Sequence, residues 1–317
     1  MSGAAKVGLF GDTGMVGQEL ERVLSVHELV EIGYRQNSRR QEGELENCDL
    51  VFLATKDTES MAFAPEVLAN GIKVIDISGA FRLPRDLFEV GYHLEHKAPD
   101  LLDEAVYGMP ALFRNEIAQA RLVANPGCYP TSVILPLRPL KELLQGEATV
   151  VATSGNSGAR QEVEEESNEL TYSYGKRHKH VPEMALYSGF QVNFTPIVLR
   201  SVFAGINTNI RVELSETSKA QPVEEAAESI REVLASEYSR DDNIEVVKDT
   251  EDKQWGTRDV VATHKLLIKL GVDDGFVYIC SLEDNLGKGA ASQAIENMNI
   301  MLGFPRLEGI GNVYRVD

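Results

Sequence analysis

The residues whose types and spacing most clearly favour chemistry lie at positions 124–131, which read Ala-Asn-Pro-Gly-Cys-Tyr-Pro-Thr. Cys128 follows a turn-forming Asn-Pro-Gly sequence and precedes Pro130, which suits the first turn of a helix. A thiol at a helix start faces unpaired backbone N–H groups and the positive end of the helix dipole, and both favour the thiolate. We therefore predict that Cys128 is a nucleophile. The alternative is a buried structural cysteine, the commonest fate of a free cysteine.

A second chemical signal is the glycine-rich turn at residues 11–17, between a predicted buried strand at 6–10 and a predicted helix at 18–26. In such a unit the glycines let the backbone approach a pyrophosphate, and the helix N-terminus attracts the anion. Glycines at this spacing also occur in ordinary tight turns. We predict a dinucleotide site whose contacts come from Gly11, Asp12, Thr13, Gly14, Met15, Val16 and Gly17.

The residues after the second predicted strand, 29–34, indicate which dinucleotide is bound. An NAD-preferring site would end this strand with an acidic residue that binds the ribose 2′-hydroxyl. Here residues 35–40 read Arg-Gln-Asn-Ser-Arg-Arg instead. Because arginines and a serine suit a 2′-phosphate, we predict NADP(H), held by Arg35, Ser38 and Arg39. The alternative is a solvated basic loop.

Predicted strands at 49–55 and 72–78, with a helix at 60–70 between them, continue the strand–helix alternation. That alternation predicts a doubly wound parallel sheet. Arg82 follows the 72–78 strand, at the edge where such sheets bind ligands, and could hold a phosphate or carboxylate through paired hydrogen bonds. The alternative is a surface arginine.

The second half of the chain offers two further anion-binding signals. A predicted strand at 149–153 leads into a loop rich in glycine and serine that ends at Arg160 and offers free N–H groups. Residues 178–180 read His-Lys-His, and in an extended segment His178 and His180 would point in opposite directions. Basic neighbours would lower the pKa of a histidine there. No carboxylate or cysteine cluster accompanies the pair, which disfavours a metal site; the alternative for either histidine is a structural hydrogen-bonding role.

The remaining pattern predicts a second domain that is mostly antiparallel. An amphipathic helix is expected at 223–238. Residues 273–275, Asp-Asp-Gly, predict a hairpin turn between two strands, and a final helix ends at residue 302. The other strands are expected at 192–196, 198–210, 211–214, 261–272 and 276–281.

Composition excludes some classes of function. The chain has 317 residues, which is enough for two domains, and its formal net charge of −18 argues against a nucleic-acid surface. Cys48, Cys128 and Cys280 are too few and too scattered for a disulfide framework. No apolar stretch approaches the length needed to span a bilayer, and no signal-peptide pattern opens the sequence. We expect a cytoplasmic protein.

A phosphate-binding turn, a helix-end cysteine, candidate anion-binding arginines and a histidine pair together suit reductive acyl transfer. A thiolate attacks an activated acyl group, and the resulting thioester is electrophilic enough to accept hydride from a nicotinamide. A histidine would take and return the protons.

These residues also resemble those of the N-acetyl-γ-glutamyl-phosphate reductases of arginine biosynthesis. The similarity runs in family order over nearly the whole chain, through residues 11–17, 52–55, 76–82, 125–131, 153–155, 178–183 and 284–291. The Pro-Gly-Cys-Tyr-Pro-Thr element at 126–131 is the most specific of these motifs. The resemblance implies an α/β fold, with a Rossmann-type doubly wound parallel sheet and an α+β catalytic domain like that of glyceraldehyde-3-phosphate and aspartate-semialdehyde dehydrogenases.

The same resemblance implies roles and boundaries. Residues 1–127 and 284–317 would form the NADP-binding domain, and residues 128–283 the catalytic and dimerisation domain of a homodimer or homotetramer. Cys128 would be the nucleophile and His180 the acid/base. Substrate would meet Arg82, Asn156, Arg160 and His178, while further cofactor contacts would come from Thr55, Ser78, Gly158 and Asn285, with Asn285 at the nicotinamide end.

Two departures keep alternatives open. The segment between Tyr34 and Asp49 is shorter than the family usually carries, and residues 196–201 keep only part of the family pattern. The chain also mixes a glycine turn like that of the longer family branch with residues 178–184 like those of the shorter branch. A reductase of a related acyl phosphate, an aminoadipyl phosphate of lysine biosynthesis or aspartyl phosphate, is one alternative. A non-catalytic dinucleotide-binding regulator is another, although a regulator needs no helix-end thiol.

Overall fold

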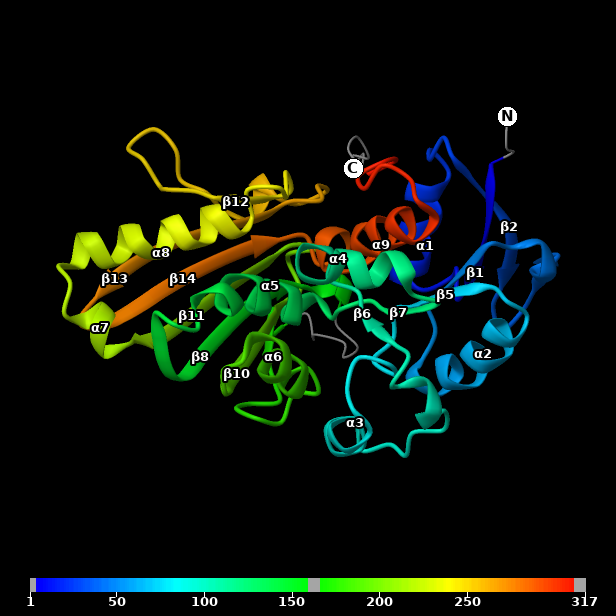
Figure 1. Ribbon diagram of the computed structural model, residues 1–317, viewed down its shortest axis with the longest axis horizontal. Coiled ribbons are helices and arrows are strands. Elements are labelled where there is room, and N and C mark those ends of the chain that lie inside the picture. The colour runs from blue at the N-terminus through cyan, green and yellow to red at the C-terminus, as the bar shows by residue number, and fades with distance from the viewer. Residues whose placement is uncertain (1–3, 159–165, 311–317) are drawn as a thin grey trace. The chain divides into compact units, whose positions relative to one another are not determined.

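The structure, a computed structural model, describes residues 4–158 and 166–310 (Figure 1). The chain divides into two compact units. The first comprises residues up to Gly127 together with those from Gly289 onward, and the second runs from Cys128 to Lys288. The sequence placed the return to the first unit at residue 284.

The first unit is built on a sheet whose strand order is β3-β2-β1-β4-β5-β7-β6. Neighbouring strands are parallel except β2 and β3, which form an antiparallel hairpin. The order reverses between β1 and β4, so their carboxyl ends flank the point where doubly wound sheets bind ligands. The strands are β1 (Ala5–Phe10), β2 (Val30–Gln36), β3 (Gln41–Gly43), β4 (Leu50–Leu53), β5 (Lys73–Asp76), β6 (Val106–Tyr107) and β7 (Leu122–Ala124).

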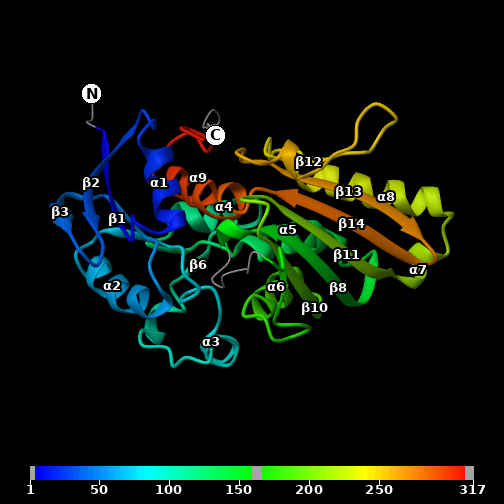
Figure 2. The same cartoon turned by 180° about the vertical axis from the view of Figure 1, so that it is seen from behind.

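Helices cover both faces of this sheet. The helices are α1 (Met15–Leu24), α2 (Asp57–Ala69), α3 (Arg85–Tyr92), α4 (Pro110–Gln119) and α9 (Ser292–Leu302). Helices α1 and α9 contact each other, and Figure 2 shows them side by side. Alternate strand residues enter two separate cores, since Leu9 and Phe52 pack with α1 and α9 whereas Phe10 and Leu53 pack with α2 and α3. The predicted doubly wound sheet is confirmed.

The second unit contains a mixed sheet of order β12-β13-β14-β11-β8-β10-β9. Pairing is antiparallel except between β12 and β13 and between β8 and β10, as the mostly antiparallel prediction requires. Asp274 and Gly275 both have positive φ at the predicted hairpin turn between β13 and β14. The strands are β8 (Leu144–Gly155), β9 (Glu169–Thr171), β10 (Val192–Leu199), β11 (Ile206–Leu214), β12 (Ile244–Val246), β13 (Leu266–Asp273) and β14 (Phe276–Glu283).

Helices contact this sheet through α5 (Cys128–Leu137), which meets β11 and β14, and α8 (Val223–Glu237), which meets β12 and β13 (Figure 1). Helix α6 (Val181–Ser188) lies against α5 and β10, and α7 (Glu216–Lys219) precedes α8. The remaining elements are short helical turns: η1 (Leu45–Asn47), η2 (Pro99–Leu101), η3 (Arg138–Leu140), η4 (Asn156–Gly158), η5 (Thr257–Asp259) and the π-type η6 (Gly287–Ala291).

Several sequence-based assignments differ from the structure. Strand β3 and helix α3 lie at positions where the sequence predicted no strand or helix. The strand breaks expected at residue 197 and between residues 210 and 211 are absent, and the strands β10 and β11 are instead separated at residues 200–205. Pro196 is accommodated within β10, where its position was read as a strand end.

Candidate active site

Cys128 is the first residue of α5, as the sequence predicted. It is a half-buried cysteine, and the helix that it opens is buried from Tyr129 to Leu137. The helix tolerates Pro130 because the first turn needs no N–H donor at that position. The backbone therefore presents this thiol at the positive end of an otherwise buried helix.

The rings of His178 and His180 both lie against that of Tyr129, the residue that follows Cys128. The ring centroids of His178 and His180 lie 5.7 Å and 6.1 Å from that of Tyr129. The two imidazole centroids are 4.8 Å apart. The expectation that they point in opposite directions is wrong, because residues 176–180 form turns rather than an extended segment.

The hydrogen bonding of the histidine pair identifies which form His178 takes. The backbone N–H of His180 donates to Nδ1 of His178 at 3.2 Å, so Nδ1 must be unprotonated. Burial, aided by the charge of Lys179, lowers the pKa of His178 to about 4. His178 is thus a neutral imidazole at neutral pH. The predicted direction of the shift is confirmed, although burial and not basic neighbours is its main cause.

Sequence reasoning missed Tyr172, which joins this cluster. Its ring centroid lies 5.6 Å from that of His178, and its hydroxyl and that of Tyr129 share a hydrogen bond. Burial raises the pKa of Tyr172, and a negative charge on the nearby Cys128 raises it further. Both phenols therefore stay protonated beside the thiol. No pattern around residue 172 distinguished this tyrosine from the nine others in the sequence.

Asn285 anchors the loop predicted to meet the nicotinamide. Its side chain accepts a hydrogen bond from Gly205 N at 2.8 Å and donates one to Ser157 Oγ at 2.9 Å. A Cβ on Gly158 would lie 3.2 Å from the Asn285 amide nitrogen, so the two residues are close neighbours. Asn156 donates from Nδ2 to Arg200 O at 3.0 Å. The structure brings Asn156, Gly158 and Asn285 together; Arg160 lies outside the described residues.

In the first unit, the glycine turn after β1 has the geometry of a phosphate cradle. Gly11 has φ of +83°, and a Cβ there would lie 2.3 Å from Ala54 O. A Cβ on Gly17 would lie 2.1 Å from Gly11 O, so the helix packs closely onto the turn. Gly14, the N-cap of α1, has no side-chain cap, and a Cβ there would meet Gly11 O at an ordinary contact distance of 3.6 Å. The turn thus leaves room and backbone N–H groups for an anion.

The basic segment after β2 is arranged differently from the simplest prediction. Arg35 Nε donates to Glu21 Oε1 on α1 at 2.8 Å, so its guanidinium is already ion-paired. Arg40, which the sequence did not select, pairs instead with Asp12 of the glycine turn at 2.5 Å. Ser38 and Arg39 occupy the exposed tip of the β2–β3 hairpin. Their predicted contact with a 2′-phosphate stays a prediction.

Thr55 and Ser78 follow β4 and β5 at the ligand-binding edge of the first sheet. Thr55 Oγ1 lies 2.9 Å from Ser60 Oγ, and Ser78 Oγ donates to Asp76 Oδ2 at 2.8 Å. Asp76 is fully buried, and burial raises its pKa to about 6 despite hydrogen bonds from Ser60 and Ser78. These side chains form a polar network beside the switch point.

Arg82 is buried, which excludes the alternative of a surface arginine. Its Nε donates to Asn125 O and its Nη2 donates to Ile77 O, both at 2.8 Å. The guanidinium therefore ties the loop after β5 to the residue that begins the Asn-Pro-Gly turn. Anion binding by Arg82 stays a prediction, while a positioning contact is observed.

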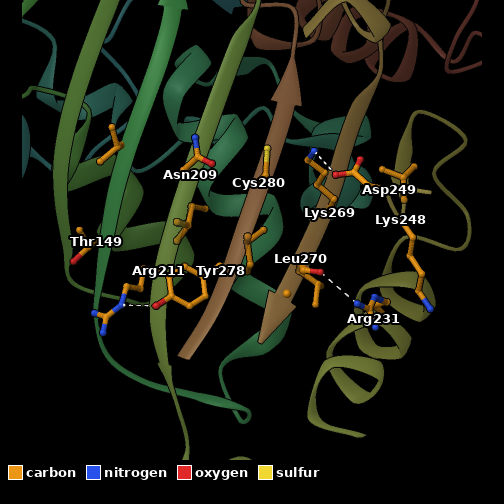
Figure 3. Close-up of a pocket in the computed structure, with 15 residues that line it drawn as sticks. Thr149, Asn209, Arg211, Arg231, Lys248, Asp249, Lys269, Leu270, Tyr278 and Cys280 are labelled. Atoms are coloured by element: carbon orange, nitrogen blue, oxygen red, sulfur yellow. Dashed lines mark hydrogen bonds and ion pairs between the residues drawn. The ribbon is translucent and has the colours of Figure 1, made fainter. Parts of the chain in front are cut away.

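Outside this cluster, a groove of about 610 Å³ lies on the second sheet (Figure 3). Val151, Asn209, Tyr278 and Cys280 of β8, β11 and β14 line its floor, and Lys248 borders it. None of its lining residues belongs to the Cys128 cluster. Within the described ranges, no group of three or more His, Cys, Asp or Glu residues could hold a metal ion. None of the helices described is long and apolar enough to cross a membrane.

Comparisons with known proteins agree with this architecture. Family models described as semialdehyde dehydrogenase NAD binding domain and semialdehyde dehydrogenase dimerisation domain match residues 36–120 and 128–285. N-acetyl-gamma-glutamyl-phosphate reductases from Thermus thermophilus and Methanopyrus kandleri are each 35% identical; the alignments cover 94% and 96% of this chain and 96% and 97% of theirs. The alignments run over 348 and 345 positions, so these relatives carry segments that the 317-residue chain lacks.

Solved structures confirm the fold. Aspartate semialdehyde dehydrogenase II from Vibrio cholerae superposes with a TM-score of 0.70 at 17% identity, covering 95% of this chain and 99% of that one. Aspartate semialdehyde dehydrogenase with NADP from Candida albicans gives a TM-score of 0.69 at 17% identity, covering 94% and 98%. At this identity the likeness shows the fold alone.

Proposed function

The chain belongs to the N-acetyl-gamma-glutamyl-phosphate reductase family, and on that premise we propose that it performs the reaction this name describes, with Cys128 as nucleophile. The reaction is the NADPH-dependent reduction of N-acetyl-γ-glutamyl phosphate to N-acetylglutamate semialdehyde and phosphate, a step of arginine biosynthesis. One observation carries the residue assignment: Tyr129, which follows Cys128 at the start of α5, packs against both histidines.

Cys128 forms and breaks the covalent bond. Its thiolate attacks the acyl carbon, a C–S bond forms, and the C–O bond to phosphate breaks with its electron pair leaving on phosphate. NADPH, when bound, supplies the hydride that reduces the thioester. The C–S bond then breaks, its electrons return to sulfur, and the aldehyde leaves. A thiolate is suited to both halves because it is a strong nucleophile and also a good leaving group.

His180 is the proposed acid/base. It accepts the thiol proton as the thiolate forms and gives that proton to the departing phosphate. The sulfur then takes up from solvent the one proton that the overall reaction consumes. His178 cannot share this task at neutral pH, because its low pKa and its occupied Nδ1 keep it neutral. We assign it to holding substrate through its other nitrogen.

The first unit has the features that an NADP(H) domain needs. Gly14 places no side chain at the uncapped N-terminus of α1, and Gly11 and Gly17 bring the backbone close. The proposed contacts are residues 11–17 with Arg35, Ser38, Arg39, Thr55 and Ser78, and from the second unit Gly158 and Asn285. The second unit, which contains Cys128, is then the catalytic and dimerisation domain. For the anionic substrate we propose Asn156, Arg160 and His178, with Arg82 as a further candidate.

The dimerisation domain indicates an oligomer, and we propose a homodimer or homotetramer formed through the grooved face of the second sheet. Val151 and Tyr278 on this face are 37% and 44% exposed in the single chain and line the same groove, so together they offer apolar area to a second copy. Val151→Glu should lower the mass measured by light scattering, whereas Val90→Glu on α3 should not. A monomeric parent protein would contradict the proposal. We propose a cytoplasmic location because a free catalytic thiol needs a reducing compartment.

The reverse reaction tests the function. The protein is incubated with NADP⁺, phosphate and a panel of semialdehydes, and NADPH formation is followed by absorbance. We expect turnover with N-acetylglutamate semialdehyde, and little with the aspartate and aminoadipate analogues. Cys128→Ser should abolish turnover, whereas Cys48→Ala, which removes a thiol buried in the other unit, should retain it. Full activity of Cys128→Ser would refute the covalent mechanism.

A further inference from the structure

The hairpin between β2 and β3 replaces the longer segment expected on the adenosine side of the cofactor site. Its tip, residues 37–40, is closed by a backbone hydrogen bond from Asn37 N to Arg40 O at 3.0 Å. Asn37 Oδ1 also accepts from the backbone N–H groups of Arg39 and Arg40 at 2.8 Å and 3.1 Å. An Asx-type turn of this kind fixes the direction in which the tip leaves β2.

One carboxylate fastens this tip to the glycine turn. Asp12 Oδ1 accepts a hydrogen bond from Asn37 Nδ2 at 2.8 Å, and Asp12 Oδ2 is paired with Arg40 Nη2 at 2.5 Å. The Asp12 side chain is 2% exposed, whereas that of Arg40 is 43% exposed. Burial alone would raise the pKa of Asp12, but the hydrogen bonds from Arg40 and Asn37 outweigh it and lower the pKa. The carboxylate is therefore ionised when the tip is docked.

The two other arginines of this segment have different surroundings. Arg35 is engaged by Glu21 on α1. Within the described part of the chain, Arg39 makes its polar contact through its backbone N–H, to Asn37. Arg40 alone of the three joins the glycine turn, and its contact with Glu42 is marginal at 3.5 Å. Its guanidinium is held in place through one nitrogen and keeps other N–H groups for a second anion.

The position of Arg40 is that of the ribose end of a dinucleotide. The tip follows β2, which lies next to β1 and its glycine turn, and in doubly wound sheets the residue at this place contacts the ribose 2′ substituent. An arginine there accommodates a 2′-phosphate. Asp12 by contrast would repel the phosphates bound by its own turn unless its charge were neutralised. Pairing with Arg40 supplies that neutralisation.

From these contacts we propose that Asp12 is a positioning residue for cofactor selection, which with Asn37 latches the hairpin tip onto the glycine turn and holds Arg40 to bind the 2′-phosphate. The inference rests on the proposed function, since it takes the bound dinucleotide to be NADP(H). It reassigns the phosphate contact from Arg35 to Arg40. It also explains how a shortened segment can still build the adenosine side of the site.

Calorimetric binding of two probes tests the latch without turnover. Adenosine 2′,5′-bisphosphate carries the 2′-phosphate and 5′-AMP lacks it, so the ratio of their dissociation constants measures phosphate selection. Arg40→Gln should weaken the bisphosphate by about 30-fold and change 5′-AMP by less than about threefold. Arg85→Gln, a change of the same kind on α3, is the matched control and should alter neither. Arg35→Gln should change the ratio of the two dissociation constants far less than Arg40→Gln does.

Asp12→Asn separates positioning from simple repulsion. If Asp12 holds Arg40, this variant should reduce the selection ratio by about tenfold, and it should reduce it no further in an Arg40→Gln background. A rise in bisphosphate affinity on Asp12→Asn would overturn the positioning role. An unchanged ratio in Arg40→Gln would overturn the assignment of the phosphate contact. If neither probe binds the parent protein, the proposed cofactor site itself is wrong. A parent protein that binds both probes, with variants that do not change the ratio, would contradict the latch alone.

Discussion

The imidazole rings of His178 and His180 lie 4.8 Å apart, centroid to centroid, with their planes inclined at 71°. The backbone N–H of His180 donates a hydrogen bond to Nδ1 of the His178 ring. This arrangement holds His178 neutral, whereas the acid/base role proposed for His180 requires a ring that gains and loses a proton.

The histidine pair should separate in a pH–rate profile. His180→Gln should lower kcat by about 10²- to 10⁴-fold, the usual contribution of a general acid/base. His178→Gln should raise KM and leave the acidic limb of the kcat profile where it is, because His178 with a pKa of about 4 is neutral over that range. Steady-state kinetics of both variants between pH 5 and pH 9 check this. A displaced acidic limb in His178→Gln would reverse the assignment.

Asp76 should make the stability of the first unit fall as pH rises. Its pKa is about 6 in the folded chain against a value of 3.8 when exposed, so folding favours the protonated form. The stability that protonated Asp76 gives the folded chain is present below about pH 4 and is lost by about pH 6. The difference of about two pKa units corresponds to a change of about 3 kcal/mol in the free energy of unfolding. Asp76→Asn should therefore gain stability over the parent across this window, as measured by urea unfolding. A difference independent of pH would contradict the prediction.

Arg82 can be tested as a positioning residue against its predicted role as a substrate ligand. Lysine keeps the charge but cannot reach the carbonyls of both Ile77 and Asn125 as the planar guanidinium does. Arg82→Lys should lower the free energy of unfolding by about 2 kcal/mol, since it leaves a buried carbonyl without its donor. Urea unfolding and steady-state kinetics are measured together. A higher KM with unchanged stability would instead favour direct contact with substrate.

Two glycines of the same turn should respond oppositely to alanine. Gly14→Ala places its Cβ 3.6 Å from Gly11 O, an ordinary contact, at an ordinary φ of −77°, so the melting temperature should stay unchanged while NADP⁺ binding weakens about tenfold. Gly17→Ala places a Cβ 2.1 Å from Gly11 O and should lower the melting temperature markedly. Thermal melts and calorimetric NADP⁺ titration distinguish the two effects. An equal loss of stability in both variants would contradict the assignment of Gly14 to the cofactor-binding part of the turn.

Local sequence signals predicted the elements that depend on local interactions. The helix start at Cys128, the helix α8 and the hairpin turn at Asp274 and Gly275 all follow from proline, glycine and apolar spacing. The strand β3 was not predicted, because its residues Gln41–Gly43 are exposed and carry no apolar alternation. They join the sheet by pairing with the backbone of β2.

Contacts between distant residues could not be predicted from one sequence. Arg35 and Arg40 stand five positions apart in the same basic segment, yet one pairs with Glu21 and the other with Asp12. Nothing in their spacing indicates which partner each one takes, because the choice depends on how β2 lies against α1 and β1. The same holds for Tyr172, whose place beside His178 depends on the packing of the second unit.

The core on one face of the first sheet has a consequence for synthesis of the chain. Ala294, Ile295 and Met298 of α9 pack there with Leu9 and Leu20, from the opposite end of the sequence. The second unit is continuous from Cys128 to Lys288, so all its strands have been synthesised before α9 is made. The first unit, although translated first, completes its core last. In a released chain that ends at residue 288, the second unit should therefore resist protease while the first remains cleavable.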